Sequence, residues 1–309
     1  MQVSYNGHEF EWIENWARVP DTPSWRENGR THGVAAMRDG SVVVFAQADP
    51  AVVFFAPDGT LTQSWGSRFS GAHGLTLVEE DGEELLWLTD EGSEEVVKTT
   101  LGGDTVLQIE RPPHAVYNDG RYSPTWVAVN EERFGGDGSI WVADGYGSSL
   151  VHRYDRNGNY RSTLTGEEGA GRFDCPHGLY VRHTEGRHQL IVADRGNSRM
   201  QVFDNDGLFQ MSFGEDALEL PCTCFEHLGE FIIPELNARV AVLSASGALV
   251  GYIGANESVC QNEEWPNVGA EDVKPGKFNS PHSAAVDGEG NLYIVEWMIG
   301  GRITKLLRS

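Results

Sequence analysis

Residues 175–207 read CPHGLYVRHTEGRHQLIVADRGNSRMQVFDNDG, and this stretch decides the fold. It predicts a short strand after residue 175, a second strand over 190–194 that ends in Asp, and a third over 199–204 closed by a turn. The same order recurs in five other places, with first strands beginning near residues 32, 73, 123, 221 and 280. Six copies of about 40–60 residues, each worth four short strands, predict an all-β, six-bladed β-propeller.

The last copy ends after its third strand, at residues 302–306. A segment near residues 9–16 is expected to supply the missing strand and close the ring, because closure removes free sheet edges. Helical periodicity is hard to find, and 37 glycines indicate many turns. We therefore expect one domain spanning residues 1–309.

The chain carries 23 basic and 46 acidic residues, a formal net charge of −23. Such a surface repels phosphate backbones, so nucleic-acid binding is not expected. No apolar run of about 18 residues is present, and the N-terminus lacks a basic, apolar leader. We expect no membrane contact, a monomer favoured, and a cytoplasmic location, or a secreted or periplasmic one if a leader has been trimmed.

Four copies carry a histidine at the beginning of the first strand, which should be the innermost: His32, His73, His177 and His282. The last three fall in alternate copies and are separated by 104 and 105 residues. Equivalent positions in alternate blades of a six-fold ring are related by about 120°. The spacing therefore predicts that the imidazoles of His73, His177 and His282 converge on the axis.

Three neutral imidazoles with an open coordination position are typical of a catalytic zinc site, although another divalent metal would also fit. A single Pro-His-Gly at a strand start is commonly a hydrogen-bonded structural histidine, but three in symmetric positions favour a metal. His32 breaks this symmetry. It is a candidate channel-lining or substrate-binding group, or a packed side chain.

Two further residues stand in loops that leave second strands: Tyr146 in VADGYG and Arg195 in VADRGN. A phenol beside a metal cation and an arginine can be acidified, which would make Tyr146 a general base. An arginine beside a metal can hold a carboxylate or a developing oxyanion. The alternatives are a packed aromatic for Tyr146 and a salt bridge between blades for Arg195.

Residues 192–203 (VADRGNSRMQVF) resemble the signature of NHL-repeat propellers. Residues 122–213, and more loosely the whole chain, resemble the peptidyl-α-hydroxyglycine α-amidating lyase family through SPTWVAV, WVADGY, PHGL and ADRGNSR. Members of that family are six-bladed propellers that bind zinc through three histidines and cleave a carbinolamide C–N bond, releasing an amide and glyoxylate. The resemblance implies His73, His177 and His282 as zinc ligands, Tyr146 as catalytic base and Arg195 as its charge partner.

The chain departs from the family at two positions in particular. Gln47 stands where the family has a second active-site arginine, and Ser283 replaces an aspartate tied to structural calcium, so we expect no calcium site. Both are candidate substrate-binding positions. The predicted activity is a zinc-dependent lyase that acts on a small α-hydroxyglycine or carbinolamide-type acid and releases an amide or urea-like product and glyoxylate.

Two alternatives stay open at this point. One is a non-catalytic NHL-type propeller that presents its loops to a protein partner and holds no metal. The other is a metal-dependent propeller hydrolase of the lactonase type, which would use inward carboxylates and amides for a hard cation.

Overall fold

The computed structural model describes residues 1–184 and 186–309, which fold into six antiparallel sheets. We call these sheets blades 1–6 in chain order of their first strands. The chain divides into two compact units, Gly71–Glu215 and the combination of Met1–Ser70 with Asp216–Ser309. The fold class is the predicted six-bladed β-propeller, while the expectation of a single domain stays a prediction.

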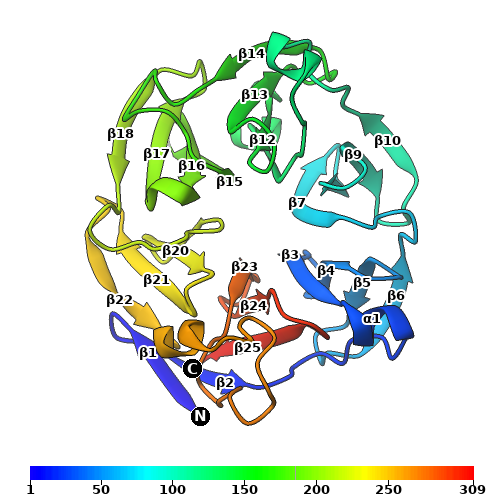
Figure 1. Ribbon diagram of the computed structural model, residues 1–309, viewed down its shortest axis with the longest axis vertical. Coiled ribbons are helices and arrows are strands. Elements are labelled where there is room, and N and C mark those ends of the chain that lie inside the picture. Colours follow the sequence, from blue (N-terminus) through cyan, green and yellow to red (C-terminus); the bar gives the residue numbers. More distant parts are fainter. Residues whose placement is uncertain (185) are drawn as a thin grey trace. The chain divides into compact units, whose positions relative to one another are not determined.

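The unit Gly71–Glu215 holds blades 2, 3 and 4, coloured cyan to yellow-green in Figure 1. Each blade runs in chain order from its first strand to its fourth. Blade 2 comprises β7 (Ala72–Glu80), β8 (Glu83–Asp90), β9 (Glu95–Thr100) and β10 (Thr105–Gln108); blade 3, β11 (Trp126–Val129), β12 (Ile140–Asp144), β13 (Leu150–Tyr154) and β14 (Tyr160–Leu164); blade 4, β15 (Pro176–Thr184), β16 (Arg187–Asp194), β17 (Arg199–Asp204) and β18 (Phe209–Phe213). Three 3-10 turns lie between strands: η1 (Ala115–Asn118), η2 (Glu132–Phe134) and η3 (Arg195–Asn197).

The second unit holds blades 1, 5 and 6. Blade 1 comprises β3 (Arg30–Ala36), β4 (Val42–Gln47), β5 (Val52–Phe55) and β6 (Leu61–Trp65); blade 5, β19 (Phe225–His227), β20 (Glu230–Glu235), β21 (Arg239–Ser244) and β22 (Leu249–Ile253); blade 6, β23 (Pro281–Val286), β24 (Leu292–Glu296) and β25 (Arg302–Arg308) with β1 (Gln2–Tyr5) and β2 (His8–Ile13). A short helix, α1 (Pro23–Glu27), precedes blade 1, and a 3-10 turn, η4 (Glu257–Gln261), follows blade 5.

The N-terminal strand completes blade 6, as predicted. β2 pairs antiparallel with β25, and β1 adds a fifth strand outside it (Figure 1). Phe10 and Trp12 of β2 are buried against Phe278 and the strands of blades 5 and 6. Because the first and last segments of the chain share one sheet, this edge of blade 6 is covered by the chain's own terminus.

Blade 5 departs from the expected pattern at its first strand. The sequence suggested a strand from Pro221 to Phe225, but β19 covers only Phe225–His227, and Pro221 forms an isolated bridge to Glu235. The first strands of blades 4 and 6 also begin at a proline, Pro176 and Pro281, so the proline alone does not shorten the strand of blade 5. Cys222 and Cys224 are buried here, and all four cysteines are free thiols.

The cores lie between neighbouring sheets. In the unit Gly71–Glu215, Trp87 belongs to the core between blades 2 and 3, and Trp141 to the core between blades 3 and 4. Both indole rings are buried completely or nearly so. Burying an aromatic side chain of this size contributes roughly 2–3 kcal/mol to the free energy of unfolding, so these tryptophans stabilise the packing of neighbouring blades and with it the loops at the blade ends.

Candidate metal centre and active site

The four inner-strand histidines share one local structure. His73 and His177 lie where the register of their strands with the second strands shifts, and His32 and His282 lie at corresponding shifts in blades 1 and 6. Such a bulge bends the strand and re-aims the side chain at that point. The first strand of blade 3 carries no histidine and pairs without a shift.

In the unit Gly71–Glu215, His73 and His177 lie within hydrogen-bonding distance of Tyr146. The Nε2 atoms of His73 and His177 lie 3.2 Å apart. The hydroxyl oxygen of Tyr146 is 3.2 Å from Nε2 of His73 and 3.1 Å from Nε2 of His177. Both histidines are completely buried, whereas Tyr146 is only partly so. Three electron-rich atoms therefore form a nearly equilateral triangle where β7 and β15 begin.

Thr125, the residue before β11, contacts both histidines from blade 3 and orients the imidazole of His73. Its carbonyl oxygen accepts a hydrogen bond from Nδ1 of His73 at 2.8 Å, and its hydroxyl donates to the carbonyl of His177 at 2.8 Å. Since a carbonyl can only accept, Nδ1 of neutral His73 carries the proton and Nε2 presents a lone pair to the triangle. Gly74 permits this approach, because a Cβ there would lie 2.5 Å from the Thr125 carbonyl oxygen.

Arg195 contacts the triangle from blade 4. Its Nη1 donates to the Tyr146 hydroxyl at 3.2 Å, and its Nη2 donates to Sγ of Cys175 at 3.2 Å. The guanidinium carbon also lies 5.1 Å from the centre of the Tyr146 ring. Burial raises the pKa of the Cys175 thiol, a rise that Arg195 only partly opposes, so Cys175 is a neutral partner and not a nucleophile.

The remaining predicted residues lie in the other unit. His282 is buried, and its Nδ1 donates to the carbonyl of His32 at 2.9 Å, with the two imidazole rings 4.5 Å apart. Gln47 ends β4 opposite Arg30 and is half-buried. Ser283 is buried and pairs with Val295 of β24. In both His282 and His73, Nδ1–H donates a hydrogen bond to a backbone carbonyl, which orients the imidazole ring.

The donor set in the unit Gly71–Glu215 fits a zinc ion. Two nitrogen ligands on one tetrahedral zinc, each at about 2.0–2.1 Å, lie roughly 3.3 Å from one another. The observed separation of 3.2 Å is close to this value. The orienting carbonyl fixes the tautomer that a metal requires. Nothing in the donor chemistry of His73 and His177 opposes a borderline-soft divalent cation.

Sequence reasoning identified His73, His177, Tyr146 and Arg195 but missed Thr125 and Cys175. The signal for Thr125 was its place one blade along from each histidine, in SPTWVAV, at the position where other blades carry His. Cys175 stands directly before the Pro-His-Gly of blade 4. Thr125 can be recognised only by knowing that one blade reaches the histidines of its neighbours, and Cys175 only by knowing that its sulfur contacts Arg195.

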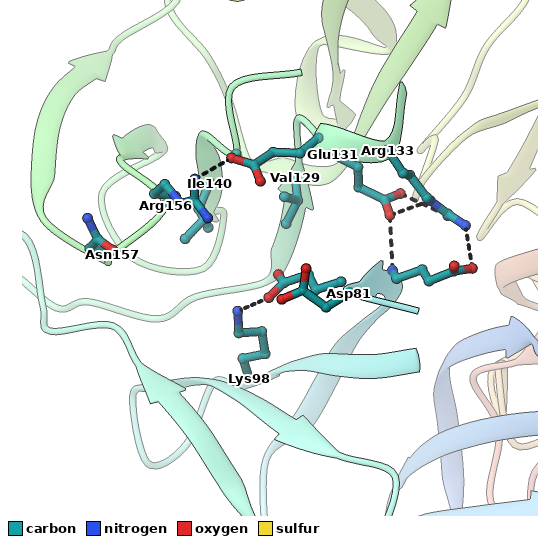
Figure 2. A pocket seen from close by; sticks show the side chains of 12 residues that line it. Asp81, Lys98, Val129, Glu131, Arg133, Ile140, Arg156 and Asn157 are labelled. Atoms are coloured by element: carbon teal, nitrogen blue, oxygen red, sulfur yellow. Dashed lines mark hydrogen bonds and ion pairs between the residues drawn. The ribbon is translucent and has the colours of Figure 1, made fainter. Parts of the chain in front are cut away.

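A polar cavity of about 370 Å³ lies at the far end of β7 from His73 (Figure 2). Its charged lining side chains are largely paired with one another: Lys98 with Glu80 at 2.6 Å, and Arg156 with Glu132 at 2.6 Å. It holds none of the predicted site residues. We therefore place the candidate active site at the triangle and not in this cavity.

Comparison with known proteins supports the resemblance that the sequence indicates. No family profile matches the chain. Human NHL repeat-containing protein 3 is 28% identical over 244 residues, 70% of this chain and 64% of that protein. A probable peptidyl-alpha-hydroxyglycine alpha-amidating lyase of Caenorhabditis elegans is 23% identical over 304 residues, 87% of this chain and 80% of that protein.

Solved structures agree on the fold. A streptogramin B lyase structure matches 97% of this chain and 98% of its own length, with a TM-score of 0.62 and 12% identity. At this identity the likeness concerns the fold alone. Among the described residues, no helix has the length and apolar character needed to cross a membrane.

Proposed function

We propose that the protein is a zinc-dependent carbon–nitrogen lyase that acts on a small α-hydroxyglycine or carbinolamide-type acid. The observation that carries the proposal is the triangle of His73 Nε2, His177 Nε2 and the Tyr146 hydroxyl, with Arg195 on the phenol. Amidating-lyase relatives among known proteins support the reaction class.

In this proposal His73 and His177 hold the zinc. His282 takes the same strand position and has the same Nδ1 hydrogen bond in its own blade, and its role as a third ligand stays a prediction from the sequence. Bound zinc would supply a Lewis acid that lowers the pKa of the substrate hydroxyl. His32, Gln47 and Ser283 are proposed to line the substrate side of blades 1 and 6.

The chain's own residues would then move one proton. The phenolate oxygen of Tyr146, favoured by the Arg195 guanidinium, takes the proton of the substrate hydroxyl. The C–O bond becomes a carbonyl as the C–N bond breaks, and the departing amide nitrogen receives the proton. The products are an amide and glyoxylate, so atoms and charge balance without a further reactant.

The test combines metal content with turnover. Purified protein is expected to hold one zinc and to release glyoxylate from N-benzoyl-α-hydroxyglycine. His177→Ala should remove most of the zinc and the activity, whereas the control His188→Ala, in the same hairpin, should retain both. Zinc bound at His177 without any glyoxylate release would contradict the lyase reaction.

A binding propeller is the second candidate, favoured by the human NHL repeat relative. It predicts a protein without stoichiometric metal and no effect of His177→Ala on its metal content.

A further inference from the structure

An acidic residue ends the second strand of five blades and anchors the loop that follows. These five side chains are completely buried: Asp90, Asp144, Asp194, Glu235 and Glu296. In blades 4, 5 and 6 the carboxylate pairs with an arginine that begins the third strand directly opposite. The pairs are Asp194–Arg199 at 2.8 Å, Glu235–Arg239 at 2.6 Å and Glu296–Arg302 at 2.9 Å.

Blades 2 and 3 lack this arginine, and in blade 2 the residue opposite Asp90 is Glu95. The residue opposite Asp144 is Leu150, which offers no charge. Asp144 accepts hydrogen bonds from the backbone N–H groups of Ser123 and Ser148, both at 2.6 Å, much as Asp90 does from Gly71 and Ser93. In place of a guanidinium it accepts a hydrogen bond from the hydroxyl of Tyr117 at 2.7 Å. Tyr117 comes from η1, 27 residues earlier in the chain, so a loop replaces the missing arginine.

The Tyr117 hydroxyl is itself held by a chain of hydrogen bonds through blade 3. Because it donates to Asp144, its oxygen accepts from Nε2 of His152 at 2.7 Å. Nδ1 of His152 then accepts from the Thr163 hydroxyl at 2.9 Å, and Thr163 accepts from Tyr160 at 2.8 Å. Burial lowers the pKa of His152 to about 3, so its imidazole is neutral. A neutral imidazole donates from one nitrogen and accepts at the other, so all these hydrogen bonds run in one direction, from Tyr160 toward Asp144.

Asp144 lies two residues before the candidate base, Tyr146. The backbone carbonyl of Asp144 accepts from Ser149 N at 3.1 Å, and its carboxylate accepts from Ser148 N, which closes a tight turn around Tyr146. Gly147 has no room for a side chain, since a Cβ there would lie 2.0 Å from the Asp144 carboxylate. The Asp144 carboxylate therefore holds the turn, and the turn positions the phenol of Tyr146.

We propose that Tyr117 and His152 are positioning residues for Tyr146: they hold the Asp144 carboxylate, and through it the turn that presents the phenol to His73 and His177. The role of Tyr146 as base rests on the proposed function, but the placement of its turn does not. Without the Tyr117 hydroxyl, a buried carboxylate loses one of its donors and the turn loosens. A displacement of about 1 Å at a reacting group can cost roughly a hundredfold in rate.

The experiment compares Tyr117→Phe with Tyr154→Phe. Tyr154 is a buried phenol of the same core cluster, and its hydroxyl donates to the Glu110 carbonyl at 3.3 Å, whereas that of Tyr117 donates to Asp144. Hydrogen exchange of the Ser123 and Ser148 amides should be faster in Tyr117→Phe by about tenfold or more, and unchanged in Tyr154→Phe. His152→Leu should show the same effect to a smaller degree and serves if Tyr117→Phe does not fold.

Turnover provides the second readout. In N-benzoyl-α-hydroxyglycine cleavage, kcat of Tyr117→Phe should fall about 10- to 100-fold while KM and zinc content stay near those of the wild type. Unchanged exchange at Ser123 and Ser148, or faster exchange with an unchanged kcat, would overturn the proposal. If the wild-type protein released no glyoxylate, the proposed function would fail, and selectively faster exchange would still support the positioning of the turn.

Discussion

Replacing Tyr146 by phenylalanine separates the catalytic role of the phenol from its structural role. The hydroxyl makes three contacts of 3.1–3.2 Å, to Nε2 of His73, Nε2 of His177 and Nη1 of Arg195. For folding, the loss of a hydroxyl with such contacts costs about 0.5–1.5 kcal/mol. For catalysis, the loss of a general base costs about 10²- to 10⁴-fold in rate, equivalent to roughly 3–5 kcal/mol of barrier.

The two effects are measured on the same protein. Urea unfolding gives the change in free energy of unfolding, zinc analysis shows that the metal is retained, and glyoxylate release from N-benzoyl-α-hydroxyglycine gives kcat. We expect the loss in the barrier to exceed the loss in stability by a clear margin. A zinc-loaded Tyr146→Phe protein with kcat within about threefold of the wild type would refute the assignment of Tyr146 as base.

Substitutions at three further positions have defined outcomes. Arg195→Lys keeps a charge but has one nitrogen for two partners, so kcat should fall about tenfold, and Arg195→Met should lose considerably more in the same assay. Arg302→Met removes the partner of the fully buried Glu296 and should lower the free energy of unfolding by about 3–5 kcal/mol in urea, whereas an unchanged midpoint would contradict that pairing. Burial lowers the pKa of His152 to about 3 in the folded protein, so as pH falls the unfolded chain takes up this proton before the folded one does. The free energy of unfolding should therefore fall by a few kcal/mol as pH drops from about 6.5 toward 3. In urea titrations at several pH values, His152→Leu should flatten this slope.

The sequence contained most of the fold because each blade repeats a local pattern. Short continuous apolar runs such as 190–193, closed by turn residues, predict strands, and six copies of the pattern specify the class. The first strand of blade 5 was predicted too early in the sequence, because β19 covers only Phe225–His227 and Pro221 forms an isolated bridge before it. β1 was missed because a fifth strand has no counterpart in the repeat.

The site was predictable where its residues follow the repeat. His73 and His177 occupy the same position in alternate blades. Tyr146 and Arg195 lie in corresponding loops of blades 3 and 4, directly after the second strand. Tyr117 and Cys175 could not be found in this way. Tyr117 reaches Asp144 from a loop between blades, and Cys175 matters only through its contact with Arg195. Both depend on how one segment lies against another, which no spacing in a single chain encodes.

The measurement that tests the central claim most directly is an X-ray anomalous difference map at the zinc edge, from crystals of protein purified without added metal. We predict one strong peak at about 2.0–2.1 Å from Nε2 of both His73 and His177. A map without a peak there, with Nε2 of His73 hydrogen-bonded directly to the Tyr146 hydroxyl, would contradict the metal site and the chemistry proposed for it.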